Sequence, residues 1–109
     1  MDLNNSYPAP VISQEMILSY LRRRHEEIRA CRDALTQQNW EVLKRTGHRI
    51  KGNAETFGLP QLAPIAEKLE KCADQKEAQQ AAPLLNQLES AVEEALAEAS
   101  AEGAGKSPS

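Results

Sequence analysis

The residue of this sequence best suited to chemistry is His48, which has one lysine four positions before it and another three positions after it. A neutral imidazole is a competent nucleophile near neutral pH. On a helix, Lys44 and Lys51 would lie one turn before and one turn after the ring, where they can attract and partly neutralise a phosphoryl group. The sequence places no Gly-rich phosphate loop, carboxylate triad or metal-ligand cluster beside this histidine. His48 is therefore predicted to accept a group from another molecule, without the parts needed to bind and cleave a nucleotide.

Two glycines lie beside this histidine in a segment of helical period, although an interior glycine costs about 1 kcal/mol relative to alanine. On a helical wheel of about 100° per residue, His48 falls about 140° from the apolar stripe and is expected to point outward. Gly47 falls on the stripe, where it would let a neighbouring helix approach closely. Gly52 falls on the His48 side, where it would leave room for a second protein. The stripe consists of Leu43, Gly47, Ile50, Ala54 and Phe57, and Lys44, Lys51 and Glu55 share the outer face with His48.

Apolar residues recur at spacings of three and four in four successive segments, which predicts an all-α fold. Short links between the segments favour antiparallel neighbours, and hence an up-down-up-down four-helix bundle. We expect the bundle to cover residues 12–100. Residues 1–11 are expected to form a flexible N-terminal arm and residues 101–109 a disordered tail.

Capping residues and prolines mark the expected helix ends. Pro64 fits only in a first turn, so the third helix is expected to start a residue or two after Pro60. Pro83 is expected in the first turn of the fourth helix or at a kink. The first helix is expected to begin after Ser13 and to end near Gln37, and the second to begin after Asn39 and to end at a left-handed Gly58. Residues 74–77 are expected to connect the third helix to the fourth.

Composition narrows the possible functions. The net charge of −3 gives no general reason to expect nucleic-acid binding. No signal peptide or bilayer-length apolar run is visible, so no membrane association and a cytoplasmic location are expected. Cys31 and Cys72 fall on or near apolar faces and are expected to be buried, reduced thiols. His25 is expected to be a plain surface residue, or to have a minor role in docking. A zinc site built from these cysteines and the two histidines would need residues on different faces to converge, so no metal site is expected.

The stretch around His48 resembles the signature of histidine-containing phosphotransfer (HPt) domains. That signature is His-x-x-Lys-Gly, followed six residues later by a glycine and then by a helix that ends in Leu-Glu. The matching residues are His48-Arg49-Ile50-Lys51-Gly52, Asn53-Ala54, Phe57-Gly58, Leu62 and Leu69-Glu70. Two departures are mild, because Gly47 stands where an alanine is usual and Ile50 where a leucine is common. The motif covers the central third of the chain, and the predicted bundle agrees over residues 12–100.

The resemblance implies a phosphorelay role. His48 would be phosphorylated by an aspartyl-phosphate on a receiver domain and would pass the group to another receiver. Lys51 would be its electrostatic partner and Gly52 the access residue. The expected partners are response-regulator receiver domains and a hybrid sensor histidine kinase. The chain would work as a monomer without a cofactor of its own, since the Mg²⁺ belongs to the receiver.

We expect a receiver to dock on the outer face of the second helix, with apolar surface from the first helix nearby. The residues expected on this docking face are Lys44, Arg45, Arg49, Glu55, Met16 and Tyr20.

The alternative interpretation is a non-catalytic helical adaptor that docks on a receiver or kinase, although an adaptor would not need His48. Histidine kinase dimerisation domains usually have an acidic residue after their histidine and a proline a few positions on. Here Arg49 follows, and the next proline is Pro60.

Overall fold

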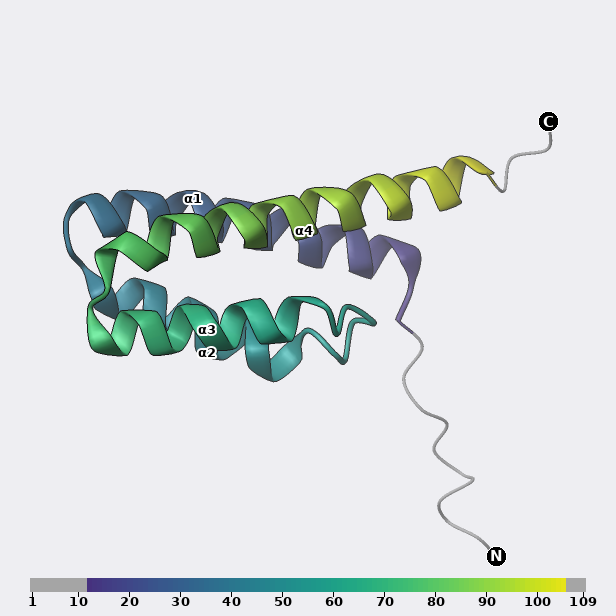
Figure 1. Cartoon of the computed structure of the whole chain (residues 1–109). Coiled ribbons are helices and arrows are strands. Elements are labelled where there is room, and N and C mark those ends of the chain that lie inside the picture. The colour runs from purple at the N-terminus through teal and green to yellow at the C-terminus, as the bar shows by residue number, and fades with distance from the viewer. Residues whose placement is uncertain (1–11, 106–109) are drawn as a thin grey trace, which may run out of the picture.

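The computed structural model describes residues 12–105, which contain four helices and no strand. Each helix packs on its neighbour in sequence, and α1 also packs on α4, so that the first and last helices of the bundle are in contact. Figure 1 shows α1 beside α4 and α2 beside α3, with successive helices antiparallel. The predicted all-α, up-down-up-down bundle is confirmed. The helices are α1 (Gln14–Thr36), α2 (Trp40–Asn53), α3 (Leu62–Gln75) and α4 (Ala78–Gly105).

The core is built from the predicted apolar stripes. Every helix contributes aliphatic side chains that are fully excluded from solvent. Burial of one such side chain is worth about 1.5–3 kcal/mol, so these stripes supply the main driving force for the fold. Cys31 and Cys72 are both buried and free, as expected. The largest fully buried side chains are Leu21, Ile28, Leu43, Ile50, Leu62, Leu69, Leu85, Leu88 and Val92.

The start of α1 follows the predicted capping. The Ser13 hydroxyl accepts a hydrogen bond from the backbone N–H of Met16 at 3.1 Å, which satisfies one of the donors left open by a helix N-terminus. Asn39 precedes α2 as expected, but its side chain makes no capping hydrogen bond. The chain turns between these helices through Gln38, which has a positive φ of 59°.

The end of α2 differs from the expectation of a helix continuous to Gly58. The helix ends at Asn53, and residues 54–58 form a tighter turn. In that turn, N–H groups bond carbonyls three residues back, and the N–H of Leu59 reaches the carbonyl of Ala54 at 2.9 Å. Gly58 has a φ of +73°, so the predicted left-handed glycine does close the segment. The periodicity could not reveal the early end, because Ala54 and Phe57 still face the core from the turn.

The ends of α3 and α4 confirm part of the proline analysis. α3 begins at Leu62, so Pro64 lies in its first turn. Pro83 is the sixth residue of α4, just beyond a first turn. The last helix continues to Gly105, so residues 101–105 are helical where a disordered tail was expected. The physical reason is that no proline interrupts this alanine-rich segment before Pro108.

The expected arm at residues 1–11 and the last four residues of the expected tail, 106–109, lie outside the described residues. Between residues 12 and 105, no helix has the length and apolarity needed to span a membrane.

Candidate functional site

The candidate site is centred on His48, which α2 presents to solvent. Its side chain is 71% exposed, in agreement with the helical wheel. The ring is nevertheless held from one side, because its Nδ1 atom lies 3.0 Å from Oε2 of Glu70 on α3. A carboxylate from a second helix therefore fixes one edge of an otherwise accessible imidazole.

Glu70 also binds Lys51, so a single carboxylate bridges the two residues. Its Oε1 atom lies 2.9 Å from Nζ of Lys51, and its side chain is only 19% exposed. The hydrogen bond from Lys51 is the main cause that lowers the pKa of Glu70, and the bond with His48 adds to it, against the opposing effect of desolvation. The same bond raises the pKa of Lys51. Glu70 is therefore ionised and Lys51 is charged at neutral pH.

The bond to Glu70 decides which nitrogen of His48 can react. An ionised carboxylate can only accept a hydrogen bond, so Nδ1 must carry the proton. In the neutral ring, Nε2 then holds the lone pair, on the edge of the ring away from Nδ1. The arrangement presents a nucleophilic nitrogen on an exposed side chain and keeps the proton on the side of the protein.

Gly47 sets the spacing that brings Glu70 to His48. A Cβ atom at position 47 would lie 2.7 Å from the carbonyl oxygen of Ala66 and 2.9 Å from the backbone nitrogen of Glu70. These distances are too short for van der Waals contact, so α2 and α3 approach each other as closely as they do only because residue 47 lacks a side chain. The predicted packing role of Gly47 is thus explained, and its contact is with the backbone of Glu70 itself.

Gly52, in contrast to Gly47, has no neighbour that a side chain would contact. A Cβ atom there would meet nothing within 4 Å, and the residue is exposed. Packing inside the bundle therefore does not require glycine at this position. Open space next to an exposed nucleophile is what a partner protein would need in order to bring its own reactive group to the ring.

The predicted basic face around His48 is present, but its charges are paired. Nζ of Lys44 lies 3.0 Å from Oδ1 of Asp74. Nη1 of Arg49 lies 2.7 Å from Oε2 of Glu27. Arg45 contacts Glu41 at 3.5 Å, one helical turn away. The hydrogen bond to Asp74 raises the pKa of Lys44. The positive potential of this face is consequently weaker than the sequence alone suggests, and an incoming anion must compete with the carboxylates.

The expected apolar part of the docking face needs correction at Tyr20. Its side chain is buried, with 7% exposure. The ring stacks on Phe57 at 4.1 Å between centroids, and the hydroxyl donates to Oδ1 of Asn53 at 2.5 Å. The buried guanidinium of Arg24 lies 4.4 Å from the same ring. Sequence spacing missed this cluster because the contacts join α1 to the last residue of α2 and to the turn after it. Met16 is 46% exposed and Glu55 is exposed, so both remain available to a partner.

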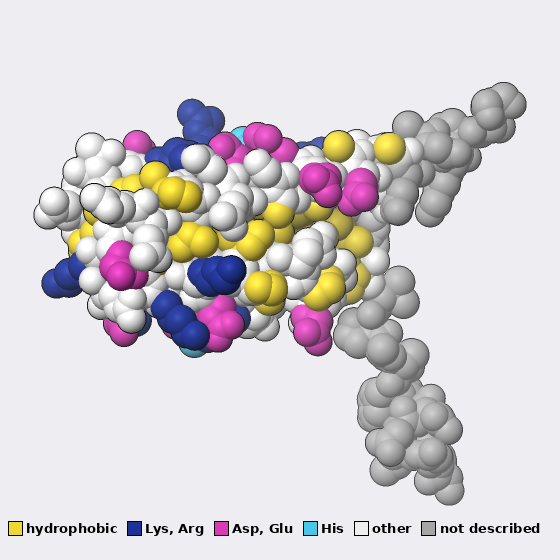
Figure 2. All heavy atoms as spheres, in the orientation of Figure 1, with side chains coloured by type: hydrophobic (Ala, Val, Ile, Leu, Met, Phe, Trp, Pro, Cys, Tyr) yellow, Lys and Arg dark blue, Asp and Glu magenta, His cyan; other side chains and the backbone are white. Residues whose placement is uncertain are grey.

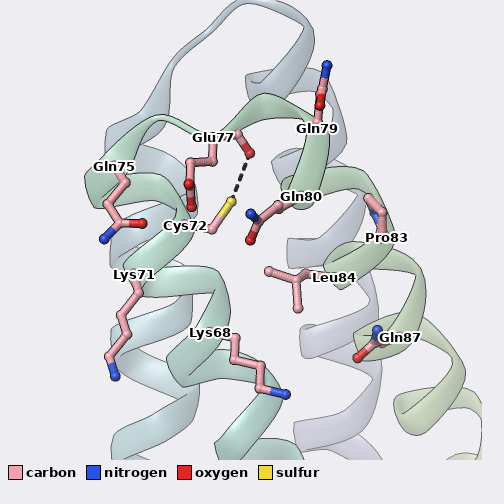
Figure 3. Close-up of a pocket in the computed structure, with 10 residues that line it drawn as sticks. All are labelled: Lys68, Lys71, Cys72, Gln75, Glu77, Gln79, Gln80, Pro83, Leu84 and Gln87. Atoms are coloured by element: carbon pink, nitrogen blue, oxygen red, sulfur yellow. Dashed lines mark hydrogen bonds between the residues drawn. The ribbon is translucent and has the colours of Figure 1, made fainter.

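A hollow of about 440 Å³ lies between α3 and α4, on the other side of α3 from α2 (Figure 3). Cys72 reaches it, but its thiol donates to the carbonyl oxygen of Glu77 at 3.0 Å, and burial raises the pKa of the thiol. A protonated, hydrogen-bonded thiol is a poor nucleophile. Figure 2 shows a band of hydrophobic side chains on this face between rows of polar ones, which is typical of packed core edges. We assign no chemistry to this hollow.

Glu70 is the site residue that sequence reasoning did not assign. It belongs to the Leu69-Glu70 pair of the resemblance, but no role was predicted for it there. Its position immediately after a core leucine places it at the margin of the buried face of α3. Only the orientation of α3 against α2 shows that this margin faces His48.

A comparison with protein-family models assigns the chain to a family. A family model described as the Hpt domain matches residues 15–101, which is most of the chain. The chain belongs to the Hpt domain family. Neither the search of curated proteins nor that of solved structures gave a match. As an Hpt domain, the protein has a phosphotransfer-type function in two-component systems, and the family implies interaction with receiver domains and kinases.

Proposed function

We propose that this Hpt domain is a phosphorelay intermediate, which accepts a phosphoryl group on His48 from a receiver aspartyl-phosphate and passes it to another receiver. The observation that carries the proposal is the bond between Nδ1 of His48 and Glu70 at 3.0 Å, on a side chain that is 71% exposed. That bond fixes the tautomer and leaves Nε2 as the nucleophile. A helical adaptor would need neither feature.

In the proposed step, the lone pair of Nε2 attacks the phosphorus atom of the aspartyl-phosphate. A nitrogen–phosphorus bond forms, and the bond between phosphorus and the aspartyl oxygen breaks, with its electron pair leaving on the carboxylate. Because Nδ1 keeps its proton, the imidazole ring becomes positively charged as the bond forms. The ionised Glu70 lies where it stabilises that charge. The reverse sequence on a second receiver regenerates the neutral histidine.

Lys51 would assist by sharing its charge. Its amino group is bound to Oε1 of Glu70 in the resting site, and its side chain is 38% exposed. An arriving phosphoryl group offers stronger acceptor oxygens than a carboxylate, so the flexible lysine can move part of its hydrogen bonding to it. Glu70 would then keep its bond to the imidazole of His48, where its negative charge stabilises the positively charged ring.

A receiver would dock over the outer face of α2. Lys44, Arg45, Arg49 and Glu55 are exposed on that helix and the turn after it, and Met16 adds exposed apolar surface from α1. The pairing of the basic residues with carboxylates favours a partner of mixed charge over a polyanion. The metal for the transfer would be held by the receiver, and we propose the cytoplasm, where receivers act, as the location.

The proposal is tested by incubating the purified chain with a receiver that carries a radiolabelled aspartyl-phosphate. We expect the label to move to the chain and to be acid-labile and base-stable, as a phosphohistidine is. Transfer onward to a second, unlabelled receiver should then be seen in a chase. Binding to the receiver with no transfer of label, for every receiver of the same cell, would instead support the adaptor.

Gly52→Gln should impair transfer while leaving the fold intact. The added side chain would clash with nothing in the bundle, because position 52 is exposed, but it would occupy the approach to the ring. Because displacement of reacting groups by about 1 Å can cost about 10²-fold in rate, we expect a loss of that order. The measurement is the rate of label transfer, with circular dichroism and thermal unfolding as the fold control. A transfer rate equal to that of the wild type would refute the access role of Gly52.

A further inference from the structure

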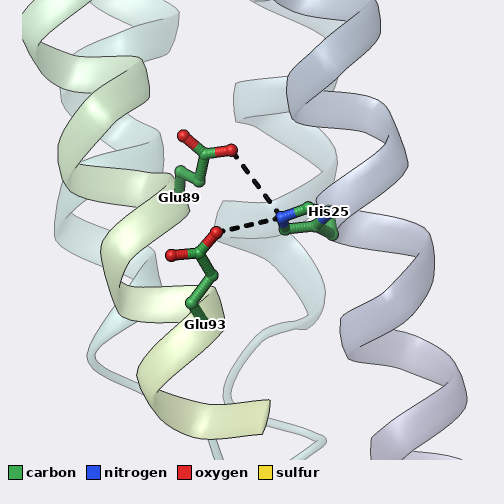
Figure 4. A group of neighbouring side chains, drawn as sticks. All are labelled: His25, Glu89 and Glu93. Carbon is green, nitrogen blue, oxygen red and sulfur yellow. Dashed lines mark hydrogen bonds and ion pairs between the residues drawn. The ribbon is translucent and has the colours of Figure 1, made fainter. Parts of the chain in front are cut away.

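A second histidine takes part in a cluster at the interface of α1 and α4, the pair of helices away from His48 (Figure 4). Nε2 of His25, on α1, lies 3.2 Å from Oε2 of Glu93 and 3.7 Å from Oε2 of Glu89, both on α4. The two glutamates are four residues apart, so they stand on one face of α4, one turn from each other. One potential ligand atom from each residue lies within 4.8 Å of the others.

The two separations from His25 are close to those between neighbouring ligand atoms around a small transition-metal ion. Zinc binds imidazole nitrogen and carboxylate oxygen at about 2.0–2.2 Å, so the edges of its tetrahedron are about 3.3–3.6 Å long. The two measured distances from His25, 3.2 and 3.7 Å, fall close to that range. We propose that His25, Glu89 and Glu93 bind a divalent transition-metal ion of the zinc type, with a water molecule as the fourth ligand.

A second observation supports the same conclusion. Arg32, on α1, binds Oε1 of Glu89 at 2.5 Å, while Oε2 of that carboxylate faces His25. One oxygen is thus anchored by a cation and the other is oriented toward the cluster. Metal-binding carboxylates are commonly held in this way by hydrogen bonds from outside the coordination shell.

The charge of the cluster also favours a cation. With a neutral imidazole, Glu89 and Glu93 carry two negative charges on neighbouring turns, and Arg32 offsets one of them. Like charges four residues apart on a helix repel each other. A divalent ion removes this repulsion and joins α1 to α4 through residues that are far apart in sequence. It would therefore bind the folded chain and stabilise it.

The test is a calorimetric titration of the full chain with zinc chloride, together with thermal unfolding of the chain with and without zinc. We expect one ion per chain and, near saturation, a rise in Tm of about 5 °C or more. His25→Gln should weaken zinc binding at least tenfold and remove the rise in Tm. Glu93→Gln should also weaken binding at least tenfold. The side chain of Glu93 is 59% exposed, so this variant carries little risk to the fold.

His48→Gln is the matched control, because the chain has two histidines and each variant keeps one of them. It should bind zinc as the wild type does. If zinc binding is lost in His48→Gln and kept in His25→Gln, the ion binds at the other histidine and the proposal fails. If the wild type shows no saturable binding, His25 makes only an ion pair with the two glutamates, which also overturns it. Neither result bears on phosphotransfer, which uses the opposite interface.

Discussion

His48→Gln is expected to abolish the transfer of label from a phosphorylated receiver, with a fall in rate of at least about 10³-fold. The amide keeps polarity and hydrogen bonding at this exposed position but has no nucleophilic lone pair. Since the side chain is 71% exposed, the variant should fold as the wild type does. The measurement is the time course of labelling, with the same receiver preparation for both proteins.

His25→Gln serves as the control for this experiment. It removes the other histidine, which lies at the α1–α4 interface, and should be labelled at the wild-type rate. If label persists in His48→Gln, the accepting residue has been misassigned. If both variants lose it, the loss reflects damage to the fold or to docking, and not the absence of one nucleophile.

Gly47→Ala and Gly52→Ala should change stability in opposite directions, although the same methyl group is added to the same helix. At position 47 the methyl group would lie 2.7 Å from a backbone oxygen of α3, so the two helices must move apart. Overpacking of this kind costs about 1–3 kcal/mol, more than the gain of up to about 1 kcal/mol in helix propensity. At position 52 nothing lies within 4 Å, and only the gain remains.

Thermal unfolding of the two variants measures this difference directly. We expect Gly47→Ala to melt below the wild type and Gly52→Ala at or above it, with about 10 °C between the two variants. Gly47→Ala should also transfer phosphate more slowly, because separation of α2 from α3 moves Glu70 away from His48. Equal stability of the two alanine variants would show that contact with α3 does not determine the residue at position 47.

Much of this molecule follows from local patterns in the sequence. The period of apolar residues predicts four helices and the outward direction of His48, because both depend on the geometry of a single helix. Gly58 and Pro64 are equally local, since a left-handed turn favours the first and a first helical turn accommodates the second. The resemblance to HPt domains rests on such a local motif, and the family match over residues 15–101 confirms it.

The remaining features depend on how helices are oriented against each other. Glu70 contacts His48 from another helix, 22 residues further along the chain. Glu89 and Glu93 contact His25 from a helix more than 60 residues further along the chain. Tyr20 was expected on the exposed docking face, yet its contacts with Asn53 and Phe57 bury it. The pairing of the basic face with carboxylates has the same origin. A helical wheel carries no information on any of these contacts.

The most direct test of the account is to locate the phosphoryl group on the phosphorylated chain by heteronuclear NMR, which correlates phosphorus with the ring nitrogens of isotope-labelled histidine. Glu70 holds the proton on Nδ1 of His48, so the account predicts phosphorus bonded to Nε2 of that residue. Phosphorus on Nδ1 of His48, or on either nitrogen of His25, would contradict it.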